Sequence, residues 1–155
     1  MTTLIVSGVL ALVVAGLMVG NEITVGFFVH PQLWKLDDAT HVKAAQPLAR
    51  IFGAFMPFWY AATLITSSFF TYQLHTLSNP IFFRLAIAAT VIWLLSIICT
   101  IVALAPINDE VAKWNLENLP RNWKERRRLW DNRHAIRVIA LLIAFIFLTI
   151  ACVGR

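Results

Sequence analysis

Four long apolar runs constrain the fold of this chain more than any other feature. Each is close to the roughly 20 residues that an α-helix needs to cross a bilayer, and only 14% of the 155 residues are charged. A soluble domain carries about 25% charged residues, so we expect an all-α integral membrane four-helix bundle, a single membrane domain over residues 1–155. The expected spans are residues 4–28, 51–74, 82–105 and 136–153.

Basic residues are concentrated on one side of this expected bundle. Of the 13 lysines and arginines, only Arg84 and Arg155 belong to the opposite side. By the positive-inside rule, we expect both large loops in the cytoplasm and both termini outside, in a multi-pass protein of a bacterial inner membrane. Because the cations flank membrane ends rather than a soluble face, we expect the lipid bilayer as a partner and no nucleic acid.

The first run is expected to be a true span with two constrained faces. No basic segment precedes it, and it is too long for the apolar core of a signal peptide. Gly16, Gly20 and Thr24 recur every four residues, a spacing at which small residues let another helix approach closely. This face predicts a possible homo-oligomer, while Glu22 lies on roughly the opposite side because successive helical residues turn by about 100°.

The 29 residues from Pro106 to His134 are too many for a bare turn. Val111, Trp114 and Leu119 indicate a short amphipathic helix at the cytoplasmic interface between spans three and four. A proline in a first turn then predicts a new helix that begins near Pro120 and continues into the fourth span. The following residues step by three or four and share one face of that helix: Trp123, Arg127, Trp130, His134 and Arg137.

The expected topology brings four polar residues toward one end of the bundle. Glu22 and His30 follow in the first span, Asn108 closes the third span, and His134 opens the fourth. Glu22, Gly26 and His30 are spaced by four, which leaves a glycine notch between two polar side chains. An ionisable residue inside a span costs a few kcal/mol, so Glu22 is a candidate functional residue.

These side chains leave two chemistries open. Glu22, His30 and His134 form a ligand set that suits copper, zinc or non-haem iron, so a copper or non-haem iron cofactor is one hypothesis. Without a metal, the same groups offer a general base that removes an acidic C–H proton. The sequence has no HExxH or Glu-x-x-His motif, and the two cysteines have no metal-binding spacing, so the residues do not choose between a cofactor and none.

Three short motifs carry a family resemblance. VHPQL ends the first span, LAPIN ends the third, and RRRLWDNRHAIR leads into the fourth. In these motifs and in its layout the chain resembles the small four-span family that includes the anthrone oxygenases of polyketide pathways. The positions that carry the resemblance are His30 with Pro31, Pro106 with Asn108, Trp130, His134 and Arg137.

The resemblance implies oxidation of the methylene of a lipophilic anthrone to a quinone carbonyl with O2. In that reaction Glu22 or His134 would act as the base. His30, Asn108 and Arg137 would orient the substrate or stabilise the developing oxyanion. The same cluster binding a redox metal that activates O2 is the alternative implied by the ligand set.

A non-enzymatic role is the competing hypothesis. The small-residue face of the first span and the small soluble portion fit an oligomeric accessory subunit of the membrane or a small transporter. The second and third spans hold no ionisable residue deep inside, which disfavours a polar transport pathway.

Overall fold

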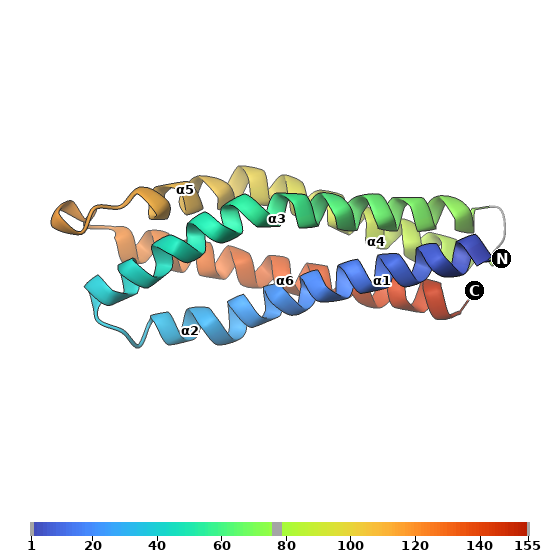
Figure 1. Cartoon of the computed structure of the whole chain (residues 1–155), viewed down its shortest axis with the longest axis horizontal. Coiled ribbons are helices and arrows are strands. Elements are labelled where there is room, and N and C mark those ends of the chain that lie inside the picture. Colours follow the sequence, from blue (N-terminus) through green and yellow to red (C-terminus); the bar gives the residue numbers. More distant parts are fainter. Residues whose placement is uncertain (1, 76–78, 155) are drawn as a thin grey trace.

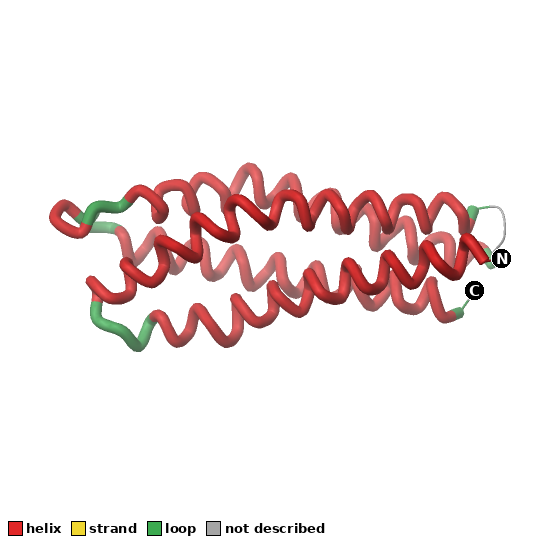
Figure 2. Tube along the Cα trace, in the orientation of Figure 1, coloured by secondary structure: helices red, strands yellow, loops and turns green. Residues whose placement is uncertain are grey.

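The computed structural model describes residues 2–75 and 79–154, and Figure 1 shows four helical rods that run side by side along one long axis. Within these described residues the secondary structure is helical without strands, and Figure 2 places the loops at the ends of the rods. In chain order the elements are α1 (Thr2–Ile23), η1 (Thr24–Val29), α2 (His30–Leu33), α3 (Asp38–Leu74), α4 (Pro80–Cys99), η2 (Thr100–Leu104), α5 (Ala105–Lys113), η3 (Leu116–Asn118) and α6 (Trp123–Val153).

Each rod is long and apolar enough to cross a membrane. The first consists of α1, η1 and α2, the second of α3, the third of α4, η2 and α5, and the fourth of α6. Both chain ends lie at the same end of the bundle, while the α2–α3 loop and the α5–α6 connection lie at the other (Figure 1). The expected all-α, multi-pass membrane four-helix bundle is confirmed; Arg155, one of the two cations assigned to the outer side, is outside the described residues.

The rods extend beyond the apolar runs of the sequence. Helix α3 begins at Asp38, 13 positions before the apolar run at residue 51, because Asp37 caps it by accepting a hydrogen bond from the Thr40 N–H at 3.0 Å. The pKa of Asp37 is lowered by hydrogen bonds from the side chain and then the backbone of Thr40. Hydropathy therefore locates the spans, whereas capping sets where the helices begin.

The connection between the third and fourth rods differs in detail from the expectation. Val111 belongs to α5, which continues the third rod instead of forming a separate interfacial helix. Val111 and Ile107 are buried in a cluster with Leu104 and Trp130, so the amphipathic face of this segment packs on the bundle. A single 3-10 turn, η3, follows it, and α6 begins at Trp123 rather than at Pro120.

Small and large residues have separate places in the bundle. The main core buries alanines from several rods around Trp93, Phe70 and Leu141. These small side chains let the helices pack closely, which stabilises a bundle in lipid, where the hydrophobic effect does not drive helices together. Large apolar side chains such as Leu17, Phe58 and Ile136 are exposed on the outside. Such an extensive exposed apolar surface is typical of a protein surrounded by lipid.

The small-residue face of α1 is only partly used within the bundle. A Cβ at Gly16 would lie 3.2 Å from the Phe145 ring of α6, whereas a Cβ at Gly20 would meet no atom within 4 Å. Gly20 and Thr24 are exposed. The oligomer expected from this face therefore stays a prediction.

Two rods contain a widened π-helical turn just before a proline. η1 ends two residues before Pro31, and η2 ends two residues before Pro106. A proline inside a helix lacks the N–H donor and its ring displaces the preceding turn, and a π turn accommodates this with one additional residue. Both widened turns contribute residues to, or lie beside, the polar site described next.

Candidate functional site

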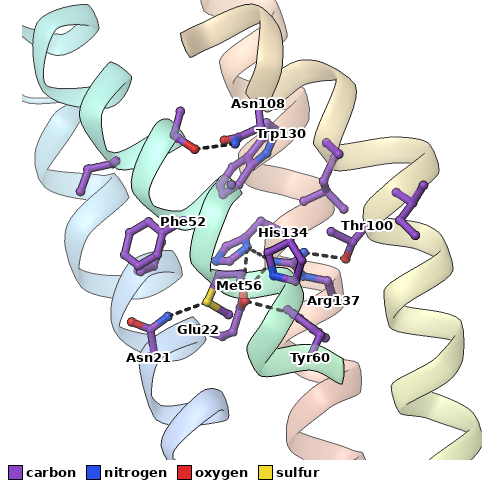
Figure 3. A pocket seen from close by; sticks show the side chains of 18 of the residues that line it. Asn21, Glu22, Phe52, Met56, Tyr60, Thr100, Asn108, Trp130, His134 and Arg137 are labelled. Carbon is purple, nitrogen blue, oxygen red and sulfur yellow. Dashed lines mark hydrogen bonds and ion pairs between the residues drawn. The ribbon is translucent and has the colours of Figure 1, made fainter. Parts of the chain in front are cut away.

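A buried ion pair joins the first and fourth rods. Glu22 is 2% exposed, and its Oε2 accepts a hydrogen bond from Nη2 of Arg137 at 2.7 Å. Its other oxygen, Oε1, accepts from the Tyr60 hydroxyl at 3.0 Å, while Nη1 of Arg137 donates to Thr100 Oγ1 at 2.7 Å (Figure 3). All four rods therefore contribute to one network, whose extra hydrogen bonds offset the cost of burying two charges.

His134 is attached to the same network. Its Nδ1 lies 2.9 Å from Nη2 of Arg137 and 3.4 Å from Oε2 of Glu22. Because a guanidinium can only donate, Nδ1 accepts, and a neutral His134 carries its proton on Nε2. That Nε2 faces the predicted glycine notch, since a Cβ at Gly26 would lie 3.0 Å from it. The notch therefore allows His134 to approach η1.

A second cluster surrounds Asp131, which the sequence analysis did not single out. Its Oδ1 lies 3.0 Å from Nδ1 of His30 and 3.4 Å from Nη2 of the buried Arg127. Its Oδ2 accepts a hydrogen bond from Trp34 Nε1 at 2.7 Å. A carboxylate at this distance favours the neutral tautomer of His30 with its proton on Nδ1 and its lone pair on Nε2.

Trp130 connects the two clusters. Its ring stacks on that of His134 with centroids 4.7 Å apart and planes 14° apart, and it lies 4.8 Å from the ring of His30. The guanidinium of Arg127 lies 5.2 Å from the centre of the Trp130 ring, a distance typical of a cation–π contact. Trp130 Nε1 is buried and has no hydrogen-bond partner among the described residues.

Asn108 has a different position from the other predicted site residues. Its Nδ2 donates to the Ala49 carbonyl at 2.8 Å, which ties α5 to α3. A Cβ at Gly53 would lie 3.0 Å from the same nitrogen, so the two helices meet closely there. Asn108 lines the cavity near Trp130 but is not part of the Glu22 network (Figure 3).

An apolar cavity of about 480 Å³ lies between the four rods. This volume is within the range of roughly 300–1,000 Å³ for small-molecule sites. Its wall is mostly aliphatic and aromatic, and all five predicted site residues line it. The polar and aromatic residues on this wall are Asn21, Glu22, His30, Phe52, Tyr60, Thr100, Asn108, Arg127, Trp130, His134 and Arg137.

The predicted metal ligands do not fit a metal ion in this arrangement. The Arg137 guanidinium lies 2.7 Å from Glu22 and 2.9 Å from His134, so a positive charge already contacts the two groups that would share the ion. Among the described residues, no group of three or more histidine, cysteine, aspartate or glutamate side chains is arranged to hold a metal.

Two residues of the Glu22 network were missed because neither type indicates an ion-pair site in a sequence. Tyr60 stands in an aromatic-rich stretch and Thr100 in an apolar one. A hydroxyl in the middle of a span is a weak signal, since it can be satisfied by its own helix, as Thr100 also is through the Ser96 carbonyl. Asp131 offered a better signal as the only acidic residue within RRRLWDNRHAIR.

The fold and the site together define a multi-pass membrane protein with a buried polar site beside an apolar cavity. The family described as anthrone oxygenase matches the chain over residues 48–147, and the chain belongs to that family. Tyr60, Asn108 and the site residues of α6 fall inside the matched range, whereas Glu22 and His30 precede it. No curated protein and no solved structure matches the chain significantly.

Proposed function

We propose that this protein is a membrane-embedded oxygenase that oxidises a lipophilic, anthrone-like aromatic substrate with O2. One observation carries the proposal: buried ionisable side chains from both clusters lie on the wall of a single apolar cavity that all four rods line. Membership of the anthrone oxygenase family supports the reaction class. An apolar cavity with a few placed polar groups is the usual form of a site for such a ligand.

The proposed oxidation depends on a base, because the deprotonated substrate can itself reduce O2. Removal of one proton from the methylene of an anthrone gives an electron-rich enolate, which transfers an electron to O2. The resulting radical pair combines into a peroxide on the same carbon, and the conjugate acid of the base protonates it. Loss of the second C–H proton with cleavage of the O–O bond leaves a carbonyl and releases water. One substrate and one O2 therefore give one quinone and one water.

His30 is the base in this proposal. Asp131 faces its Nδ1, so the lone pair of Nε2 is available to a ligand in the cavity that His30 lines. Glu22 and His134, the bases expected from the resemblance, are less suited because Arg137 and Tyr60 occupy the Glu22 oxygens and Arg137 occupies Nδ1 of His134. Asp131 acts as a positioning residue.

In this proposal Arg137 and Trp130 stabilise the negative charge that develops on the substrate. Arg137 is a fixed cation on the cavity wall, and Glu22, Thr100 and His134 hold it in place. The indole N–H of Trp130, which has no partner among the described residues, is a donor for a carbonyl oxygen on which charge develops. Preorganised donors of this kind usually supply the largest part of transition-state stabilisation.

The orientation of the protein in the membrane is part of the proposal. The α2–α3 loop and the α5–α6 connection carry or adjoin the basic residues, so this end lies in the cytoplasm and the chain ends lie outside. His30 and Asp131 are then closer to the cytoplasmic face than Glu22.

Turnover of anthrone by purified protein in lipid nanodiscs tests the function. Quinone formation and O2 uptake should exceed the spontaneous oxidation measured with empty nanodiscs, with one O2 consumed per quinone. A rate equal to that of empty nanodiscs would contradict the proposal and favour a non-enzymatic membrane subunit.

A further inference from the structure

The cavity reaches the outer surface of the bundle on one side. Of its lining residues, Gly53, Pro57 and Ala61 of α3 and Ile101 of η2 are exposed, and the others are buried or half-buried. The three α3 residues are spaced by four and therefore share one face of that helix. The open side of the cavity thus lies between α3 and η2.

The local structure explains why these two elements separate. Helix α3 packs against α4 and α5, which flank η2, but makes almost no contact with η2 itself. η2 is the widened π-helical turn before Pro106, and the facing residues of α3 are glycine, proline and alanine. None of these three has a side chain long enough to fill the space, so Ile101 is the largest exposed residue at the opening.

The surroundings of this opening are apolar. Phe58 on α3 and Ile98 and Val102 on the third rod are exposed beside it. These rods are long and apolar enough to cross a membrane, and the opening lies within them rather than at their ends. In a bilayer, exposed side chains of this kind contact acyl chains. The opening therefore faces the hydrocarbon, which admits apolar solutes and excludes ions.

We propose that the cavity opens sideways into the bilayer between α3 and η2, and that an uncharged, planar aromatic substrate enters by this route. The identity of the substrate rests on the proposed function, whereas the opening itself does not. A ligand that enters here passes Ile101 and reaches Trp130, His30 and Arg137, which all line the cavity. A substrate already dissolved in the membrane then reaches the site without crossing water.

Photolabelling from the bilayer tests the opening without any substrate. Adamantane diazirine dissolved in the lipid should label the buried lining residues Met56 and Leu104, as mapped by mass spectrometry of the peptides. Ile101→Trp, which fills the opening, should reduce this labelling to background. Val102→Trp adds the same side chain at the neighbouring lipid-facing position and should leave it unchanged. Absence of labelling at Met56 and Leu104 in the wild-type protein would overturn the lateral opening.

Binding kinetics then test whether the substrate uses the opening. With anthraquinone as a product-class ligand that is not turned over, Ile101→Trp should slow association and dissociation alike, each by about 10-fold, and leave Kd nearly unchanged. Val102→Trp should change neither rate. Unchanged rates in Ile101→Trp would show that the ligand enters elsewhere. Labelling without anthraquinone binding would leave the opening in place and refute an anthrone-like substrate.

Discussion

Glu22 and Arg137, which are 115 residues apart in the sequence, form a buried ion pair at 2.7 Å between the first and fourth rods. A charge at this depth is tolerated because its partner neutralises it and Tyr60 and Thr100 add further hydrogen bonds. The pair therefore links the assembly of the bundle to the construction of the site. A similar arrangement, Asp131 with Arg127, neutralises the second cluster.

Glu22→Gln should destabilise the protein because it leaves the Arg137 guanidinium buried without a counter-charge. Loss of one partner of a buried pair costs about 3–5 kcal/mol. Thermal or denaturant unfolding in detergent measures the effect, and the double variant Glu22→Gln/Arg137→Gln should regain much of the stability.

The exposed pair of Glu110 and Arg126 provides the control for this prediction. Glu110→Gln removes the same charge at the surface and should cost no more than about 1 kcal/mol. Equal losses of stability in Glu22→Gln and Glu110→Gln would contradict a special role for the buried pair.

Gly26→Ala should disturb the site through packing alone. The added Cβ would lie 3.0 Å from the His134 ring, so the ring or η1 must shift, and overpacking of this kind costs about 1–3 kcal/mol. Gly20→Ala, where the added carbon meets nothing within 4 Å, is the matched control. Turnover and unfolding should be affected in Gly26→Ala and nearly unaffected in Gly20→Ala; the reverse order would show that the notch is not needed.

The spans and the polar face of α6 could be predicted from the sequence. Apolar length located all four rods, and a spacing of three and four correctly placed His134 and Arg137 on one face, which the structure buries. The spacing of Glu22, Gly26 and His30 also predicted a shared side of the first rod, despite the π turn between them. These features depend on local periodicity, which a sequence displays directly.

The partners of these residues could not be predicted, because they depend on how the rods rotate against one another. Nothing in the sequence pairs Tyr60 or Thr100 with a residue 37 or more positions away in another span. The contacts of Arg137 with Glu22 and His134 likewise form only when the rods pack together. These contacts are the reason that the site does not fit a metal ion. Both the apolar core and the pairing of buried charges contribute to this rotation, and the periodicity of one helix does not show which residues of another helix it will meet.

Asp131→Asn should lower kcat more than it changes KM, because the amide no longer fixes the proton of His30 on Nδ1. General base catalysis contributes typically about 10²–10⁴-fold to the rate. Loss of the correct His30 orientation should therefore lower kcat by at least about 10-fold. Asp131→Glu should restore part of the rate. Asp109→Asn, an exposed change on α5, is the control. An unchanged kcat in Asp131→Asn would show that Asp131 only neutralises the charge of Arg127 and does not position His30.

The proposed orientation predicts opposite labelling of two single cysteines in a background without Cys99 and Cys152. Thr40→Cys, at the start of α3, should react with an impermeant thiol reagent only from the cytoplasmic side, and Asn79→Cys, before α4, only from the outside. Labelling of Thr40→Cys from outside would reverse the assignment.

The rate of 18O-labelled quinone formation from anthrone under 18O2 tests the central claim most directly. Wild-type protein in nanodiscs should incorporate one oxygen atom from O2 into each quinone, faster than empty nanodiscs. His30→Gln should reduce this rate to the spontaneous level, while His75→Gln, an exposed histidine at the far end of α3, should leave it unchanged. Equal rates in wild type and His30→Gln would contradict a reaction that depends on this site.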